Sequence, residues 1–131
     1  SQHELDKYSV DWEQYLAAIG SITVCVDGRG TGARGEAFRK CTYLRMGELE
    51  SKDQVEAAQA LGKLPFVDKN RMAIWGWSFG GYNTLMAMRV GNGTFKAGSA
   101  VAPPTDRSGY IFDPFGYLFE GDVVVFSWLS L

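Results

Sequence analysis

Apolar positions along the first hundred residues switch between the 3.6-residue period of a helix and the continuous apolar runs of buried strands. A helix is predicted over residues 11–19, where four apolar side chains share one face and Gly20 suits the end. The β-branched run 22–26 predicts a strand. Beyond it the pattern predicts a glycine-rich loop at residues 27–35, a helix at 51–61 that Ser51 caps and Gly62 ends, and a loop at 64–70. The chain then continues with a strand at 71–77 that runs into Gly76, a helix at 79–90 and a last strand at 97–102.

The order of these elements indicates an α/β fold, because strands that alternate with helices form a mostly parallel sheet with helices on both faces. The pattern changes after Pro104. Residues 110–119 are crowded with aromatic side chains and have neither period, whereas 123–129 are apolar on both faces. The last run is either a buried strand of a compact domain or, at an exposed terminus, an aggregation hazard.

The most informative stretch is the pentad Gly76-Trp77-Ser78-Phe79-Gly80, which follows an apolar strand and opens a helix. This context predicts a nucleophile elbow, in which the serine hydroxyl is exposed on a strained turn. We expect Gly76 and Gly80 where a Cβ atom would clash, and Gly81 where the helix packs close to the strand. Right-handed crossovers place Ser78 at the carboxyl end of a central strand, beside helix N–H groups that stabilise negative charge.

A second glycine motif needs weighing, because Gly30, Gly32 and Gly35 have the spacing of a dinucleotide-binding loop. Glu48 and Glu50 lie roughly where a ribose-binding acid would be sought. However, three residues separate the predicted strand end from the first glycine, and no strong helix opens at the third. We therefore favour a structural loop in which Arg29 and Arg34 can pair with nearby carboxylates, and we expect no cofactor.

Composition narrows the function classes. The 131 residues suffice for one domain, and 46% apolar and 21% charged residues are typical of a globular protein. A net charge of −2 without a basic cluster argues against nucleic acid as a partner. No apolar run reaches the roughly 20 residues that span a bilayer, so no membrane contact is expected. Cys25 and Cys41, with a single histidine, do not make a convincing metal site.

Several of these stretches together resemble the prolyl oligopeptidase family of serine peptidases, and within it the dipeptidyl peptidase IV branch. The resemblance covers residues 1–106, and the remaining residues 107–131 form a divergent tail. It rests on Asp-Gly-Arg-Gly-Thr-Gly at 27–32, on the segment 66–82 with its Gly-Trp-Ser-Phe-Gly-Gly-Tyr, and on the segments 12–17, 51–58 and 101–106. Phe79 after the serine is similar to bacterial members, since animal members tend to have tyrosine there.

The resemblance implies an α/β-hydrolase domain joined to a β-propeller, in a protein able to form dimers. It implies that Ser78 is the acylating nucleophile and that the backbone N–H of Phe79 donates to the oxyanion. The substrate would be a peptide that loses an N-terminal dipeptide with proline or alanine second. Pro104 and Tyr110 would line the pocket for that residue, although Arg107 stands where the family has tryptophan. A periplasmic, cell-surface or secreted location is implied, and a cytoplasmic one stays open.

The family's acidic and histidine triad members lie downstream of the elbow, yet no histidine follows Ser78 here. The one histidine, His3, precedes it, and Asp106, Asp113 and Asp122 cannot complete a triad without a histidine. We therefore expect the chain to be a catalytic-domain fragment that is inactive alone, from an active parent protein. An esterase or lipase of the same fold and a non-catalytic interaction domain are the alternatives.

Overall fold

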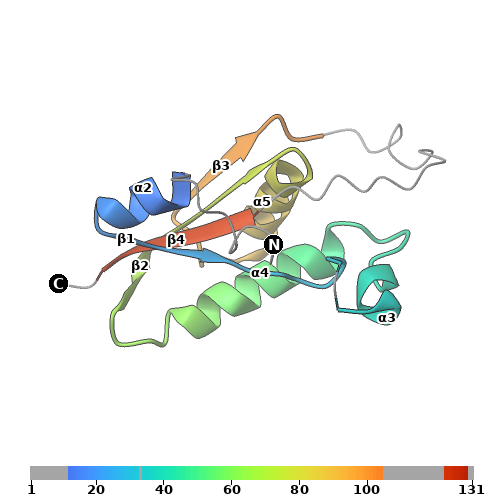
Figure 1. The fold of residues 1–131 in the computed structure, drawn as a ribbon, viewed down its shortest axis with the longest axis horizontal. Helices are drawn as coiled ribbons and strands as arrows, with labels where there is room; N and C mark the ends of the chain where they lie inside the picture. The colour runs from blue at the N-terminus through green and yellow to red at the C-terminus, as the bar shows by residue number, and fades with distance from the viewer. Residues whose placement is uncertain (1–11, 33, 105–122, 130–131) are drawn as a thin grey trace.

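The computed structural model describes residues 12–32, 34–104 and 123–129 of the chain (Figure 1). Four helices and four strands follow one another along these residues. In chain order they are α2 (Trp12–Ala18), β1 (Ser21–Cys25), α3 (Glu36–Lys40), α4 (Glu48–Leu61), β2 (Val67–Trp77), α5 (Phe79–Val90), β3 (Ala97–Val101) and β4 (Val123–Leu129). The predicted alternation of helices and strands is therefore confirmed over residues 12–101.

The four strands form one sheet in the order β1-β4-β2-β3. β2 and β3 are parallel, and β4 runs antiparallel to both of its neighbours, β1 and β2. β1, β2 and β3 consequently point in the same direction, which confirms the predicted α/β class with its mostly parallel strands. Of the two alternatives for residues 123–129, the strand is the one observed, and it lies inside the sheet.

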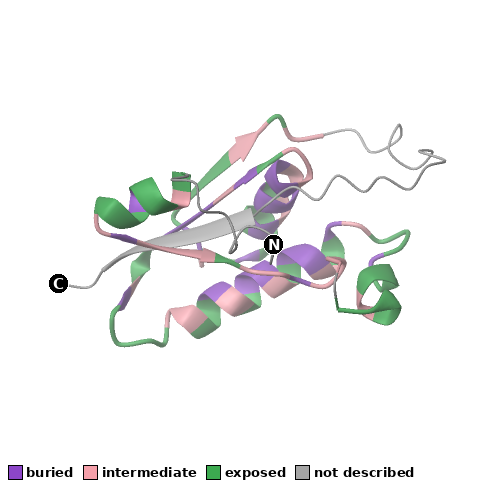
Figure 2. Ribbon diagram, viewed as in Figure 1, coloured by how far each residue is buried: buried purple, intermediate pink, exposed green. Residues whose placement is uncertain are grey.

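β2 is the central element of the hydrophobic core. Met72 and Ile74 lie on one face of this strand and pack with residues of α4, α5 and the loop before β3, namely Val55, Ala58, Ala87 and Phe95. Figure 2 shows buried positions on α4, α5 and β2. Ala73, which the two-residue period of a strand directs to the opposite face, is buried as well. Further along this second face Trp75 is partly buried and Trp77 is exposed, so the core lies mainly on the Met72 and Ile74 side.

The first turn of α4 differs from the prediction, because the helix begins at Glu48 rather than after a cap at Ser51. The Gly47 N–H donates a hydrogen bond to Glu50 Oε2 over 2.9 Å, so the glutamate closes the helix start. The Ser51 hydroxyl donates to the Gly47 carbonyl oxygen. Burial raises the pKa of Glu50, although the backbone N–H groups of Glu50 and Gly47 and the Thr42 hydroxyl stabilise its charged form.

Two other boundaries also differ. Residues 36–40 form the short helix α3 where no strong helix was predicted, and Glu36 forms ion pairs with both Arg39 and Lys40 within it. These local pairs stabilise a helix too short for a hydrophobic period to reveal it. β2 begins at Val67, so part of the predicted loop 64–70 belongs to the strand. The apolar run marks only the buried half of β2, since residues 69–71 are exposed.

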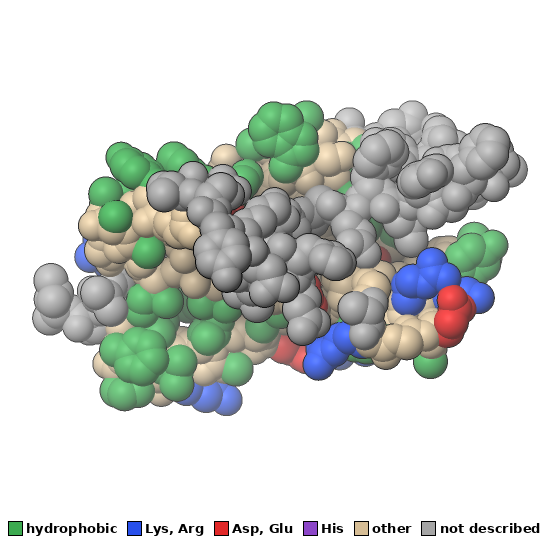
Figure 3. All heavy atoms as spheres, in the orientation of Figure 1, with side chains coloured by type: hydrophobic (Ala, Val, Ile, Leu, Met, Phe, Trp, Pro, Cys, Tyr) green, Lys and Arg blue, Asp and Glu red, His purple; other side chains and the backbone are tan. Residues whose placement is uncertain are grey.

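The surface of the described residues includes apolar side chains on α2 and just after it (Figure 3). Trp12 and Tyr15 of the helix and Ile19 beyond its end are about half exposed. The Trp12 and Tyr15 rings stack with their centroids 5.5 Å apart. Leu16 on the same helix is buried and anchors α2. No described helix combines the length and the apolar character needed to cross a membrane.

Candidate active site

Ser78 is the single residue between the end of β2 at Trp77 and the start of α5 at Phe79. Its backbone angles are φ 53° and ψ −119°, a region that non-glycine residues rarely adopt. The predicted strained turn is therefore confirmed. Conformations of this kind persist only where surrounding contacts enforce them, and they gather at functional sites. Ser78 is partly exposed, as a nucleophile that must meet a substrate has to be.

Two main-chain hydrogen bonds hold the turn in place. The Ser78 N–H donates to the Val101 carbonyl oxygen over 2.9 Å, and the Tyr82 N–H donates to the Ser78 carbonyl oxygen over 3.1 Å. Val101 is the last residue of β3 and lies opposite Trp77 in the parallel register. The serine is thus fixed at the carboxyl ends of β2 and β3, and β2 is flanked by strands on both sides. This confirms the predicted placement on a central strand.

Gly81 lets α5 approach these strands closely. A Cβ atom added at Gly81 would lie 2.9 Å from the Val101 carbonyl oxygen, 3.1 Å from the Gly76 carbonyl oxygen and 3.3 Å from Pro103 Cβ. Real Cβ atoms essentially never approach another atom as closely as the first of these distances. The expected role of Gly81 is therefore confirmed. Gly76 and Gly80 are buried, and their steric requirement stays a prediction.

Replacing Gly81 by alanine should destabilise the fold by about 1–3 kcal/mol, because the atoms in the way include two backbone oxygens that cannot rotate aside. The matched control is Gly28→Ala. Gly28 is also buried, but its added Cβ would meet its nearest atom, Asp53 Cβ, at an ordinary 3.4 Å. Urea unfolding of the two variants measures the difference. Equal midpoints for both would show that α5 can move away from the sheet at little cost.

Phe79 occupies the first position of α5. The first N–H groups of a helix have no intrahelical acceptor, so the Phe79 N–H is free to serve a group outside the helix. Its ring packs on that of Tyr82 with the centroids 5.7 Å apart. Trp77, on the other side of Ser78, exposes 59% of its surface. The serine is accordingly bordered by aromatic side chains.

The structure places the other predicted site residues as follows. Pro104 is partly buried and lies three residues beyond Val101, on the segment that leaves β3 beside the elbow. The described residues do not include the predicted pocket residue Tyr110 or Arg107. They also exclude His3 and the three aspartates discussed above, Asp106, Asp113 and Asp122. The described part of the chain contains no histidine. The structure therefore brings together Ser78 and Phe79, and the pocket residues stay predictions.

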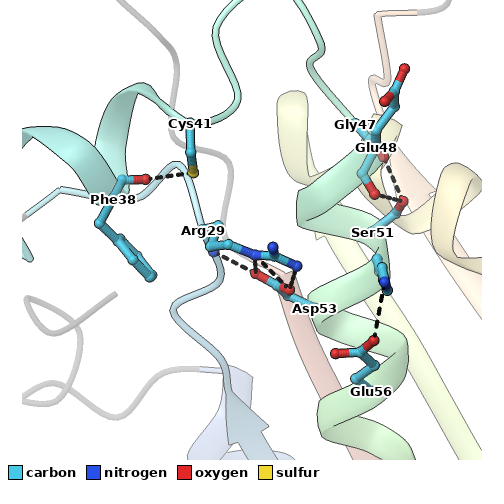
Figure 4. A network of polar contacts seen from close by, with 9 residues as sticks. Arg29, Phe38, Cys41, Gly47, Glu48, Ser51, Asp53 and Glu56 are labelled. Carbon is cyan, nitrogen blue, oxygen red and sulfur yellow. Dashed lines mark hydrogen bonds and ion pairs between the residues drawn. The ribbon is translucent and has the colours of Figure 1, made fainter.

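The glycine loop is bound to α4 through Arg29 (Figure 4). The Arg29 Nε and Nη2 atoms lie 2.9 Å and 2.5 Å from the two Asp53 carboxylate oxygens, and the Arg29 backbone N–H donates to Asp53 Oδ2 over 2.7 Å. Partial burial disfavours the Asp53 carboxylate, but the hydrogen bonds from Arg29 outweigh it and lower the pKa of Asp53. The predicted pairing of an arginine of this loop with a nearby carboxylate is confirmed.

The same loop leaves little space for a nucleotide at Gly30. A Cβ atom there would lie 2.9 Å from Thr42 Oγ1 and 3.6 Å from Glu50 Cγ, so these side chains already pack on the glycine. Glu50 accepts the Gly47 N–H and is buried. Of the two carboxylates weighed as ribose ligands, Glu50 is thus engaged in closing α4. Glu48 is exposed and forms an ion pair with Arg45. These contacts support the structural interpretation of the loop.

Sequence reasoning missed one contact beside the elbow, between Gly47 and Tyr82. Gly47 is buried with φ 87°, and the Tyr82 ring lies directly against its Cα. Gly47 with Glu50 three residues later could have indicated the helix start, because glycine is accepted at an N-cap and the glutamate can accept its N–H, but the predicted cap at Ser51 obscured it. The ring contact itself joins residues 35 positions apart, and no local pattern indicates it.

Comparison with protein families finds one family model, described as the prolyl oligopeptidase family, which matches residues 8–121. Curated relatives include proteins named probable dipeptidyl-aminopeptidase B. That of Arthroderma benhamiae is 49% identical over 108 residues, which is 81% of this chain and 12% of the relative. That of Pyrenophora teres f. teres is also 49% identical over 108 residues, with the same shares of both chains.

Among solved structures, the chain is similar to the crystal structure of Porphyromonas gingivalis dipeptidyl peptidase 4. The two share 65% sequence identity with a TM-score of 0.73, over 79% of this chain and 15% of that chain. This identity to a bacterial protein exceeds the 49% to the two fungal relatives, in agreement with the interpretation of Phe79. The chain spans about an eighth of the length of the curated relatives it matches.

Proposed function

Because this chain belongs to the prolyl oligopeptidase family, we propose that it is part of the catalytic domain of a serine dipeptidyl peptidase. The observation that carries the proposal is the backbone of Ser78, held at φ 53° between β2 and α5. A serine so placed is the shared feature of nucleophile elbows. The names of the relatives favour a peptidase over an esterase, a lipase or a non-catalytic domain.

In the proposed reaction, the Ser78 hydroxyl attacks the carbonyl carbon of the scissile peptide bond and loses its proton to a base. The carbonyl oxygen becomes an oxyanion, which the Phe79 N–H stabilises by a hydrogen bond. The C–N bond then breaks, the amine leaves with the proton, and water hydrolyses the acyl-enzyme. The described residues contain no histidine to act as the base, so we propose that the complete protein supplies it.

The substrate is proposed to be a peptide with a free N-terminus and proline or alanine in second place. Pro104 and Tyr110 would line the pocket for that side chain. The position of Pro104 supports this, since it lies on the segment that follows Val101, the hydrogen-bond partner of Ser78. Arg107, where the resemblance implies tryptophan, would alter the preference. We keep the division into residues 1–106 and a divergent tail 107–131 as part of the proposal.

The complete protein is proposed to carry a β-propeller, to dimerise, and to act in the periplasm, at the cell surface or outside the cell. These properties rest on the family resemblance. The lengths of the relatives support the presence of further domains, because the chain corresponds to 12% of each of the two curated relatives.

The test is hydrolysis by the complete protein of Gly-Pro-p-nitroanilide beside a short acyl ester, p-nitrophenyl butyrate. We expect release of nitroaniline from the dipeptide amide. Acetylation of the substrate's N-terminus is the matched control, and it should abolish cleavage if a free amine is recognised. Turnover of the ester alone would favour the esterase alternative, and cleavage of the acetylated substrate would contradict the exopeptidase specificity.

A further inference from the structure

A tyrosine one turn into α5 packs on the start of α4 in a contact that requires glycine. A Cβ atom added at Gly47 would lie 2.5 Å from Tyr82 Cε1 and 2.8 Å from Tyr82 Oη. The tyrosine ring therefore occupies the space that any other side chain at position 47 would need. The backbone there has φ 87°, which also favours glycine. We call the contact of the Tyr82 ring with Gly47 the aromatic seat.

The α4 side of the aromatic seat is fixed by hydrogen bonds. The Gly47 N–H donates to Glu50 Oε2 over 2.9 Å. The Gly47 carbonyl oxygen accepts from the Ser51 hydroxyl, as Figure 4 shows. Ser51 exposes 1% of its surface and Glu50 exposes 7%. The peptide groups on both sides of Gly47 are thus held by buried side chains of the same helix turn, and the seat has little freedom to move.

The α5 side of the aromatic seat leads directly to the elbow. The Tyr82 N–H donates to the Ser78 carbonyl oxygen over 3.1 Å. The Tyr82 ring also packs on the Phe79 ring, with the centroids 5.7 Å apart and the planes inclined by 33°. Tyr82 therefore contacts both residues of the proposed machinery, one through its backbone and one through its ring.

We propose that Tyr82 is a positioning residue, which orients Phe79 and its N–H relative to the Ser78 hydroxyl by resting on Gly47. This inference rests on the proposed peptidase function. α5 can rotate about its axis or slide on the sheet only if the Tyr82 ring leaves Gly47. Reactions at a preorganised site lose rate steeply when the groups shift, by about 100-fold for a misplacement of about 1 Å. Loss of the aromatic seat should therefore reduce stabilisation of the transition state more than it reduces substrate binding.

The test compares kcat and KM of the complete protein for Gly-Pro-p-nitroanilide across three variants. Tyr82→Leu, which removes the ring, should lower kcat by about 10-fold or more and change KM by less than about 2-fold. Gly47→Ala should do the same by displacing the ring. Tyr82→Phe keeps the ring and should retain kcat within about 2-fold, which distinguishes positioning by the ring from a role of the hydroxyl.

A destabilising variant in the core, Phe95→Leu, controls for loss of stability, since Phe95 is buried in the cluster beneath β2 and α5. It should lower the unfolding midpoint and leave kcat unchanged at temperatures well below unfolding. If Tyr82→Leu behaves like Phe95→Leu, the ring is only a packing element and the inference is wrong. A wild-type protein that fails to cleave the dipeptide amide overturns the proposed function, and this inference with it.

Discussion

Replacing Ser78 by alanine should lower the turnover of the complete protein on Gly-Pro-p-nitroanilide by about 10⁶-fold. The substitution removes the hydroxyl oxygen that we propose to form the acyl-enzyme. The fold should persist, because the Ser78 N–H and carbonyl oxygen make the hydrogen bonds to Val101 and Tyr82, and alanine retains both groups. The loss would therefore appear in activity and in covalent labelling by a fluorophosphonate, but not in the unfolding midpoint.

The matched control for this substitution is Ser99→Ala. Ser99 is an exposed serine of the neighbouring strand β3, opposite Trp75 in the register, and it has no place in the proposed machinery. Wild type and Ser99→Ala should label alike, and Ser78→Ala should not label. Labelling of Ser78→Ala at the wild-type rate would place the nucleophile elsewhere and contradict the proposed function.

The 131-residue chain by itself should label far more slowly than the complete protein. A serine hydroxyl is a weak nucleophile without an adjacent base, and no histidine follows Ser78 in this sequence. The conformation of the elbow exposes Ser78 beside the proposed oxyanion donor, and these features alone should leave only a small residual reactivity. Comparable labelling rates for the two proteins would mean that a base lies within the chain.

The elbow could be predicted from sequence because its chemistry is local. A turn between a strand and a helix needs glycine at fixed offsets from the serine, and the residues on either side show the periods of those two elements. The close approach of α5 at Gly81 follows from the same local pattern, and the distances to Val101 and Gly76 confirm it. The ends of α2 and α4, at residues 18 and 61, were similarly near the glycines that predicted them.

Features that depend on distant contacts were not predictable in this way. The pairing of β4 joins residues about 100 positions apart, such as Cys25 and Val124, and the apolar run 123–129 indicated a strand without its neighbours. The start of α4 was misplaced by three residues, because Ser51 and Gly47 both offer capping signals and only the tertiary contact with Tyr82 favours the glycine. Turn and period signals therefore predict the elements, whereas contacts between distant segments determine strand pairing and the start of α4.

Removing only the N–H of Phe79 should lower kcat of the complete protein by about 10²–10³-fold, the effect of losing one oxyanion donor in a serine protease. The change can be made by incorporating the α-hydroxy acid that corresponds to phenylalanine at position 79, which replaces the amide by an ester. Stability should fall by no more than about 1 kcal/mol, because the Ser78 carbonyl oxygen, now part of an ester, accepts the Tyr82 N–H more weakly but keeps the contact. The first N–H of a helix has no intrahelical partner to lose, and the ring that packs on Tyr82 is retained.

The control for this ester is phenylalanine itself incorporated at the same position by the same method, so that only one atom differs between the two proteins. We expect kcat for Gly-Pro-p-nitroanilide to fall and KM to stay the same, because the oxyanion exists only after the proposed attack by Ser78. An ester protein with the kcat of its control would show that the Phe79 N–H does not contact the oxyanion. The donor would then have to be sought outside α5, and the geometry of the first helical turn would have only a structural role.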